Sequence, residues 1–242
     1  MVEQELLDFL LLLDQLGFLH QLGQQLEHHQ DIPLVELALL VLLEHQDVFI
    51  TNKNFLIDLL NIFRANDRIG LVGLVGTPYM SKNGTMWNGM RYGAFYNLKE
   101  RFEKGMVKRL FPLTTGYMEM EAVDGLLMAT QYDIPWREDI FQKWDYYDVS
   151  QCFEFLKAGY KVVVPGQETE WYIHDCGIPN FDSCRRESYA FLENYPEYMA
   201  ERKEQTWEEY LEQVKIRVTE GFHGTEEVRQ ELLQFLDEVA GK

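Results

Sequence analysis

The chain has 242 residues, a formal net charge of −18 and 46% hydrophobic residues, a composition typical of a folded globular protein. Such an acidic chain repels nucleic-acid phosphates and anionic membrane surfaces, so a nucleic-acid-binding role is not expected. Its apolar runs are far shorter than the roughly 18 residues of a membrane-spanning helix, which predicts no transmembrane segment.

The cysteines and the N-terminus bear on the cellular compartment. Cys152, Cys176 and Cys184 are odd in number and lack the spacing of a metal or disulfide site, so they are interpreted as reduced thiols. The opening Met-Val-Glu-Gln-Glu is acidic where a secretory signal is basic. These features predict a cytoplasmic protein.

Residues 1–37 are rich in leucine and glutamine. Leu6, Leu10 and Leu13 recur at helical spacing, and Gly17 and Gly23 are the expected breaks. We interpret this stretch as a helical N-terminal segment. It is a candidate for assembling a homo-oligomer.

The next part of the chain alternates between strand and helix patterns. The apolar run 38–43 fits a buried strand or a buried helix, because periodicity does not separate the two over so short a length. Residues 48–50, a helix over 54–63 and a glycine-punctuated strand over 69–76 follow. Strand, turn, helix, strand is the pattern of an α/β fold.

The second half continues this pattern and then becomes helical. A strand-like run over 121–130, a helix over 148–158 and a strand over 160–165 are predicted, with further helices after residue 189. Thr225 is the predicted N-cap of the last helix. We therefore expect a helical segment 1–37, an α/β domain 38–188 and a helical extension 189–242.

The first candidate site is the turn His45-Gln46-Asp47. It follows the apolar run 38–43, and open α/β sheets bind ligands beyond the carboxyl ends of their strands. A carboxylate and an imidazole together suit Mn²⁺ or Mg²⁺, and Mn²⁺ accepts the nitrogen ligand better. On spacing alone, a solvated turn is the simpler explanation of these residues.

The second and third candidates are Asp124-Gly125 and the segment 144–148. Asp124 can accept hydrogen bonds from sugar hydroxyls, and Gly125 allows close approach to the backbone; a β-bulge or tight turn is the alternative. Asp145 and Asp148 are spaced to share one helical face, and the aromatic rings beside them, among them Trp144 and Tyr147, offer stacking surfaces for sugars. One carboxylate could act as a general base, and helix capping is the alternative.

The fourth candidate is the segment Trp171 to Asp175, which follows the predicted strand 160–165. His174 could complete a metal site with Asp47, although a single histidine is more often structural.

In order along the chain, these segments resemble the bacterial glycosyltransferase-like family related to the streptomycin-biosynthesis protein StrF, within the wider family 2 of GT-A type. The resemblance covers about residues 38–176. The matching segments, in chain order, are Glu44-His45-Gln46-Asp47-Val48-Phe49-Ile50, the glycine-punctuated run, Val123-Asp124-Gly125, Tyr146-Tyr147-Asp148, Ala158-Gly159-Tyr160-Lys161-Val162, Trp171 and His174. The chain departs from the pattern at Glu44, which is usually apolar, and at Asp145, which is usually histidine.

The resemblance implies a GT-A-like mixed sheet flanked by helices. It places Asp47, with His45 and His174, at a Mn²⁺ or Mg²⁺ ion that bridges the diphosphate of a nucleotide-sugar, a UDP-sugar being the expected donor. It implies that Asp148 is the base of an inverting transfer to a glycan or small-molecule hydroxyl, with Asp145 as a second catalytic candidate. The substrate-binding residues that it implies are Asp124, Gly125, Trp144, Tyr147 and Trp171.

Two other functions stay open. GT-A domains begin with a β-α-β nucleotide-binding half, whereas the 43 residues before Glu44 predict helices. This favours, as the alternative, a non-catalytic binding or assembly protein on a truncated GT-A fold. A metal-dependent hydrolase that uses the same carboxylates is a third hypothesis.

Overall fold

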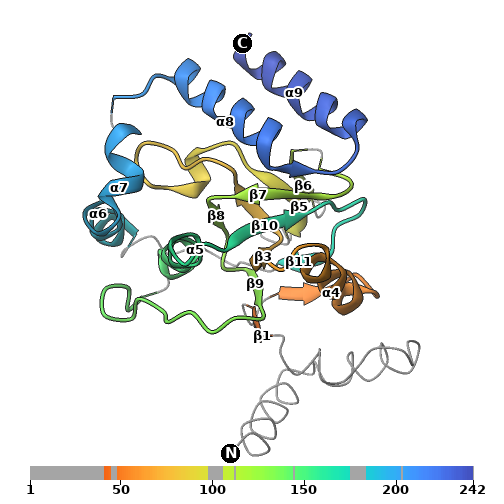
Figure 1. Ribbon diagram of the computed structural model, residues 1–242, viewed down its shortest axis with the longest axis horizontal. Coiled ribbons are helices and arrows are strands. Elements are labelled where there is room, and N and C mark those ends of the chain that lie inside the picture. Colours follow the sequence, from red (N-terminus) through yellow and green to blue (C-terminus); the bar gives the residue numbers. More distant parts are fainter. Residues whose placement is uncertain are drawn as a thin grey trace, which may run out of the picture.

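The computed structural model describes residues 41–44, 48–97, 106–111, 113–143, 145–174, 184–202 and 204–241. They form a mixed α/β structure in which helices flank two sheets (Figure 1). The predicted fold class, a GT-A-like mixed α/β fold, is therefore confirmed. The leucine-rich N-terminal segment, with its predicted role in self-association, lies outside the described residues.

The first sheet is built around two apolar strands that run parallel. Its order is β1 (Val41–Glu44), β9 (Leu127–Thr130), β3 (Ile69–Gly73), β10 (Lys161–Pro165), β7 (Tyr117–Met120) and β12 (Phe222–His223). Strands β3 and β10 pair in parallel and the other neighbours are antiparallel. All of β3 is buried, because strands at the centre of a sheet are covered on both faces. Strand β1 also settles the ambiguous apolar run in favour of a strand at Val41–Glu44.

The second sheet has the order β2 (Val48–Ile50), β11 (Tyr172–His174), β5 (Tyr92–Asn97), β4 (Val75–Thr77) and β8 (Ala122–Val123), and β6 (Met106–Phe111) pairs with β5. The prediction of one strand over 69–76 is wrong, because this stretch forms two strands in different sheets. The chain leaves β3 after Gly73 and re-enters the other sheet as β4 at Val75. Glycine punctuation permits this change of sheet, but the pairing partners determine it.

The helices and helical turns are α4 (Phe55–Ala65), η1 (Met86–Asn88), α5 (Tyr147–Lys157), α6 (Cys184–Asn194), α7 (Pro196–Met199), η2 (Ala200–Arg202), α8 (Trp207–Gly221) and α9 (Glu226–Ala240). Helix α4 confirms the predicted amphipathic helix and buries Phe55, Leu59 and Phe63 on one side. Thr225 caps α9 as predicted, because its side chain accepts a hydrogen bond from the Val228 amide.

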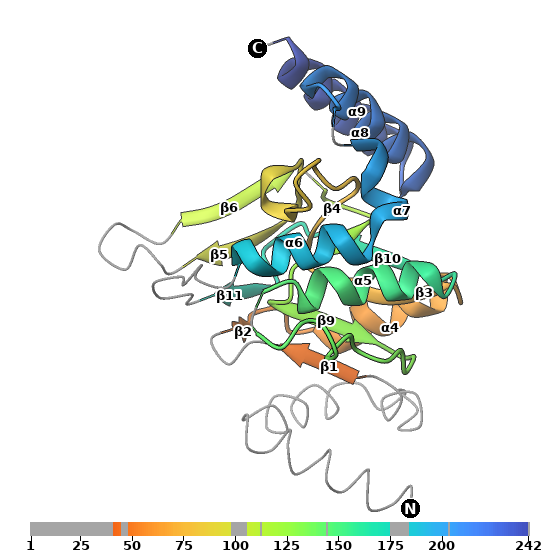
Figure 2. The same cartoon turned by 90° about the vertical axis from the view of Figure 1, so that its left-hand side faces the viewer.

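Helix α5 is the element that organises the centre of the molecule. It contacts β3 and β10 of the first sheet and β8 of the second. Helices α8 and α9 pack together at the opposite end of the molecule from β1 (Figures 1 and 2). In the described part of the chain, every helix is too short or too polar to span a membrane.

Candidate active site

The Asp124-Gly125 turn lies between β8 and β9, where the sequence predicts a polar break. The Asp124 amide donates to the Val75 carbonyl at 2.8 Å, and the Asp124 carboxylate accepts from the Leu126 amide at 3.0 Å. A Cβ on Gly125 would lie 2.0 Å from the hydroxyl of Tyr147. The turn therefore requires glycine because α5 approaches its backbone closely.

Asp148 joins this turn from the first turn of α5. Its Oδ2 accepts a hydrogen bond from the Gly125 amide at 2.8 Å, and its Oδ1 accepts one from the Val149 amide at 2.8 Å. Both Asp124 and Asp148 are half-buried. The packing of α5 against β8 thus brings together two predicted site residues that are far apart in sequence, and we refer to Asp124 and Asp148 as the carboxylate pair.

The carboxylate pair has an unusual titration. The pKa of Asp124 is raised from 3.8 to about 7, mainly by burial and, in the same direction, by the charge of Asp148. Hydrogen bonds from the Leu126 amide and the Trp87 side chain oppose this shift. Asp124 therefore changes its charge near neutral pH, beside a second carboxylate.

This titration predicts how the stability of the fold depends on pH. Between pH 3.8 and about pH 7 the unfolded chain has released the Asp124 proton while the folded chain retains it, so the contribution of Asp124 to stability falls as the pH rises. Asp124→Asn cannot ionise and is expected to gain stability relative to the unchanged protein over this range. Urea unfolding at several pH values measures the difference.

Asp139 provides a control for this measurement, because its pKa is shifted in the opposite direction to that of Asp124. A hydrogen bond from Arg137 lowers the pKa of the exposed Asp139 carboxyl. Its stabilising contribution is therefore present at neutral pH and is lost as the pH falls. Asp139→Asn is expected to produce a small change in the opposite direction. Parallel pH profiles for Asp124→Asn and the unchanged protein would contradict the raised pKa.

Sequence reasoning missed three residues around the carboxylate pair. The Trp87 side chain hydrogen-bonds to Asp124, and the Arg91 guanidinium lies 5.1 Å from the centre of the Trp87 ring. The buried Tyr172 on β11 is close enough for the charge of Asp124 to raise the pKa of its hydroxyl, after burial as the main cause. Trp87 and Arg91 lie in the 78–91 segment between β4 and β5, where the sequence shows only glycine-rich loop character. The presence of a tryptophan and an arginine in a loop was the sequence feature that could have indicated a binding role for this segment.

Asp145 lies before helix α5 and not on it. Tyr146 has a φ of 63°, the left-handed conformation, and α5 begins only at Tyr147. The prediction that Asp145 and Asp148 share one helical face is therefore wrong. The charge of Asp145 instead raises the pKa of Cys184 on α6, after burial as the main cause.

The three predicted sugar-stacking residues, Tyr147, Trp171 and Trp144, are not all found at the carboxylate pair. Tyr147 lies at the carboxylate pair, where its hydroxyl donates to the Gly125 carbonyl at 3.2 Å. Trp171 is 8% exposed and meets Phe55 edge-to-face with the ring centres 6.0 Å apart, so it is mainly a packing residue. Trp144 lies outside the described residues.

The predicted metal residues are only partly described. His174 is half-buried at the end of β11, pairs in register with Val48 of β2, and has its ring 6.5 Å from that of Phe95. Val48 directly follows Asp47 in the sequence. His45 and Asp47 themselves lie outside the described residues, and the described residues contain no group of three or more potential metal ligands.

The chain was compared with curated proteins and with protein-family profiles. No curated protein matches the chain. The sequence profile of the glycosyltransferase-like family matches residues 39–195, which is well over half of the chain and includes both members of the carboxylate pair. The chain therefore belongs to the glycosyltransferase-like family.

Proposed function

We propose that the chain is a metal-dependent, inverting glycosyltransferase that uses a nucleotide diphosphate sugar, expected to be a UDP-sugar, and a hydroxyl acceptor on a glycan or small molecule. The observation that carries the proposal is the half-buried carboxylate pair, with Asp148 held by the amides of Gly125 and Val149. The aromatic side chains of Trp87 and Tyr147 lie beside the pair and offer surfaces on which a sugar ring can stack.

In this proposal Asp148 is the general base. Its carboxylate takes the proton of the acceptor hydroxyl as the acceptor oxygen forms a bond to the anomeric carbon of the donor. The bond from that carbon to the diphosphate oxygen breaks, and its electron pair leaves with the nucleotide diphosphate. Attack from the face opposite the leaving group inverts the anomeric centre. In this proposal Asp124 hydrogen-bonds a sugar hydroxyl beside the reacting groups.

The proposed cation is Mn²⁺ or Mg²⁺. Asp47, His45 and His174 would hold it, because one carboxylate with imidazole nitrogens is a donor set that Mn²⁺ accepts. The pairing of His174 with Val48, next in sequence to Asp47, supports this assignment. The ion would supply positive charge to the diphosphate of the leaving nucleotide.

Metal removal tests this proposal. With a panel of nucleotide diphosphate sugars, release of the nucleotide diphosphate is expected to require Mn²⁺ or Mg²⁺ and to disappear in EDTA. Asp47→Asn is expected to lose both this activity and metal-dependent nucleotide binding in calorimetry. Asp133→Asn, which removes an exposed carboxylate between β9 and α5, is the matched control and is expected to behave as the unchanged protein.

Two outcomes would contradict the proposal. Full activity in EDTA would exclude metal dependence. Failure to bind any nucleotide in the presence of Mn²⁺ would instead favour the non-catalytic binding or assembly protein, which predicts an intact fold in Asp47→Asn, Asp148→Asn and His174→Ala.

A further inference from the structure

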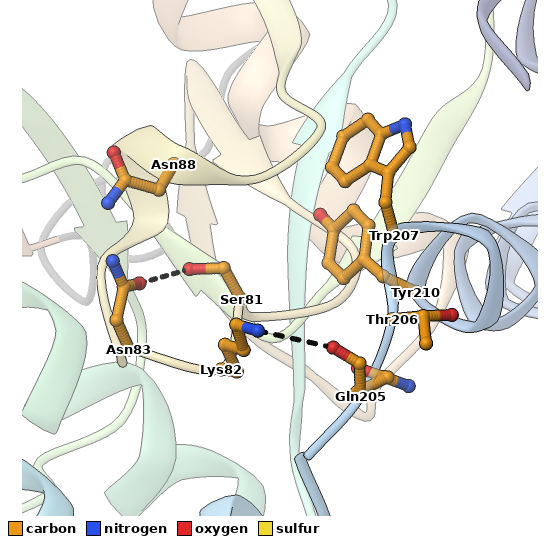
Figure 3. A pocket seen from close by; sticks show the side chains of 8 residues that line it. All are labelled: Ser81, Lys82, Asn83, Asn88, Gln205, Thr206, Trp207 and Tyr210. Carbon is orange, nitrogen blue, oxygen red and sulfur yellow. Dashed lines mark hydrogen bonds between the residues drawn. The ribbon is translucent and has the colours of Figure 1, made fainter. Parts of the chain in front are cut away.

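A pocket of about 220 Å³ lies between the 78–91 segment and the start of α8 (Figure 3). It is small, so it suits a single ring rather than an extended molecule. Its lining consists of polar and aromatic side chains, namely Ser81, Lys82, Asn83, Asn88, Gln205, Thr206, Trp207 and Tyr210. None of these residues is part of the carboxylate pair or of the proposed metal site.

The pocket has an aromatic wall. The rings of Trp207 and Tyr210 stack with their centres 5.1 Å apart and an angle of 15° between them. Tyr210 is anchored, because its hydroxyl accepts from the Met90 amide at 2.7 Å and donates to the Tyr79 carbonyl at 3.1 Å. Trp207 is 47% exposed, so it presents a large apolar surface while its ring stacks on the anchored Tyr210.

The opposite wall is made of amides. Asn83 and Asn88 lie across the pocket from Trp207 and Tyr210 (Figure 3). The carbonyl oxygen of the Asn83 side chain accepts from the Ser81 hydroxyl at 2.5 Å and from the Thr85 amide at 3.2 Å. These bonds orient the side chain of Asn83 and leave its NH₂ group to serve as the donor.

The chemistry of the two walls selects a class of ligand. An aromatic platform binds the C–H face of a sugar ring, and side-chain amides bind its hydroxyl groups. An anionic ligand is disfavoured, because Glu208 and Glu209 occupy the first turn of α8. Lys82 donates to the Gln205 carbonyl at 3.4 Å, so part of its hydrogen-bonding capacity is used within the protein. A neutral, polyhydroxylated ring fits these groups best.

The pocket is connected to the carboxylate pair through one short segment. Asn88, in its wall, directly follows Trp87, whose side chain hydrogen-bonds to Asp124. Thr85 hydrogen-bonds to the Tyr146 hydroxyl at 3.0 Å, just before the helix that carries Asp148. The 78–91 segment therefore contacts both the carboxylate pair and the pocket.

We propose that this pocket is an acceptor subsite that binds a second sugar unit of an oligosaccharide acceptor, with Trp207 as its stacking platform. The inference rests on the proposed function and names the acceptor class as an oligosaccharide. Helix α8 lies beyond the residues 39–195 that the family profile matches. The aromatic wall of the subsite therefore lies outside the matched segment, whereas its amide wall lies within it.

Trp207→Ala tests this subsite in the full chain. Binding of mono- to tetrasaccharides from cello-, chito-, malto- and galacto-oligosaccharide series is measured by calorimetry and ligand-observed NMR. The variant is expected to bind oligosaccharides at least about tenfold more weakly, with monosaccharide binding unchanged. Trp207→Phe keeps a ring and is expected to retain most of the affinity, whereas Asn88→Ala is expected to lose part of it.

Controls separate this inference from the proposed function. Ile216→Ala removes another exposed apolar side chain of α8 away from the pocket and is expected to bind as the unchanged protein. Asp133→Asn, which changes an exposed carboxylate outside the pocket and the carboxylate pair, is expected to bind oligosaccharides as the unchanged protein does. Equal binding by Trp207→Ala and the unchanged protein, or no oligosaccharide binding at all, would overturn the subsite. The proposed function is tested separately, by measuring release of the nucleotide diphosphate from the donor.

Discussion

Asp148→Asn is expected to lower kcat/KM for sugar transfer by about 10²- to 10⁴-fold, the range that a general base contributes. Asparagine has nearly the same shape but cannot take the acceptor proton. The carbonyl oxygen of asparagine can still accept from the Gly125 amide, so the carboxylate's surroundings change little there. Initial rates of nucleotide diphosphate release with acceptor present measure the effect.

The Asp148 variant also carries a structural cost that has to be separated from catalysis. Both carboxylate oxygens accept hydrogen bonds from backbone amides. With the asparagine oxygen on the Gly125 amide, the NH₂ group would face the amide of Val149, another donor. A loss of about 1–3 kcal/mol in the free energy of unfolding is expected. Circular dichroism and nucleotide binding establish that the variant is folded. A folded variant with full kcat/KM would remove Asp148 from the role of base, and Asp133→Asn is again the control.

Arg202→Met is expected to reduce the free energy of unfolding by about 3–5 kcal/mol, because it leaves a buried carboxylate without its main partner. Arg202 and Glu121 are both buried and form two hydrogen bonds, of 2.7 and 2.9 Å. Glu121 also accepts from the Met80 amide at 2.8 Å, and the Arg202 guanidinium lies 4.0 Å from the centre of the Tyr79 ring. Chemical denaturation measures the loss.

A second arginine at the same carboxylate provides the control. Arg217 donates to Glu121 at 3.1 Å, but its side chain is 48% exposed, so Arg217→Met is expected to cost about 1 kcal/mol or less. The double variant Glu121→Gln/Arg202→Met is expected to lose less than the sum of its single changes, because both act on one pair. Equal losses for Arg202→Met and Arg217→Met would contradict the importance of the buried pair.

This buried pair also has a consequence for the candidate site. Glu121 and Arg202 hold the amide and the carbonyl of Met80, at the start of the segment that carries Trp87 and Asn88. Arg202→Met is therefore expected to weaken oligosaccharide binding together with stability. Such a joint loss distinguishes it from Trp207→Ala, which is expected to leave the fold intact.

The local pattern of the sequence was sufficient for most of the elements near the site. A strand-like run over 121–130 with a polar break at Asp124-Gly125 was predicted, and the structure divides it at that break into β8 and β9. The periodicity of 148–158 predicted α5 to within one residue at each end. The start of that helix was not predictable in detail, because the left-handed conformation of Tyr146 carries no local signal.

The surroundings of the carboxylate pair were less predictable. Trp87 and Arg91 lie in a segment whose glycines suggest only a loop, and their positions follow from contacts with Asp124 and with each other. The pocket beside Trp207 depends on how α8 packs against that same segment. Contacts of this kind join residues more than 100 positions apart, which hydrophobic periodicity does not encode.

The sequence by itself determined the α/β class and singled out Asp124, Gly125 and Asp148 as site candidates, because hydrophobic period and residue type are local properties. The tertiary structure decided that Asp148 lies at the Asp124-Gly125 turn. It also decided that the pKa of Asp124 rises to about 7. Both outcomes depend on the packing of α5 against β8, which sets the distance between the charges and the amount of water around them.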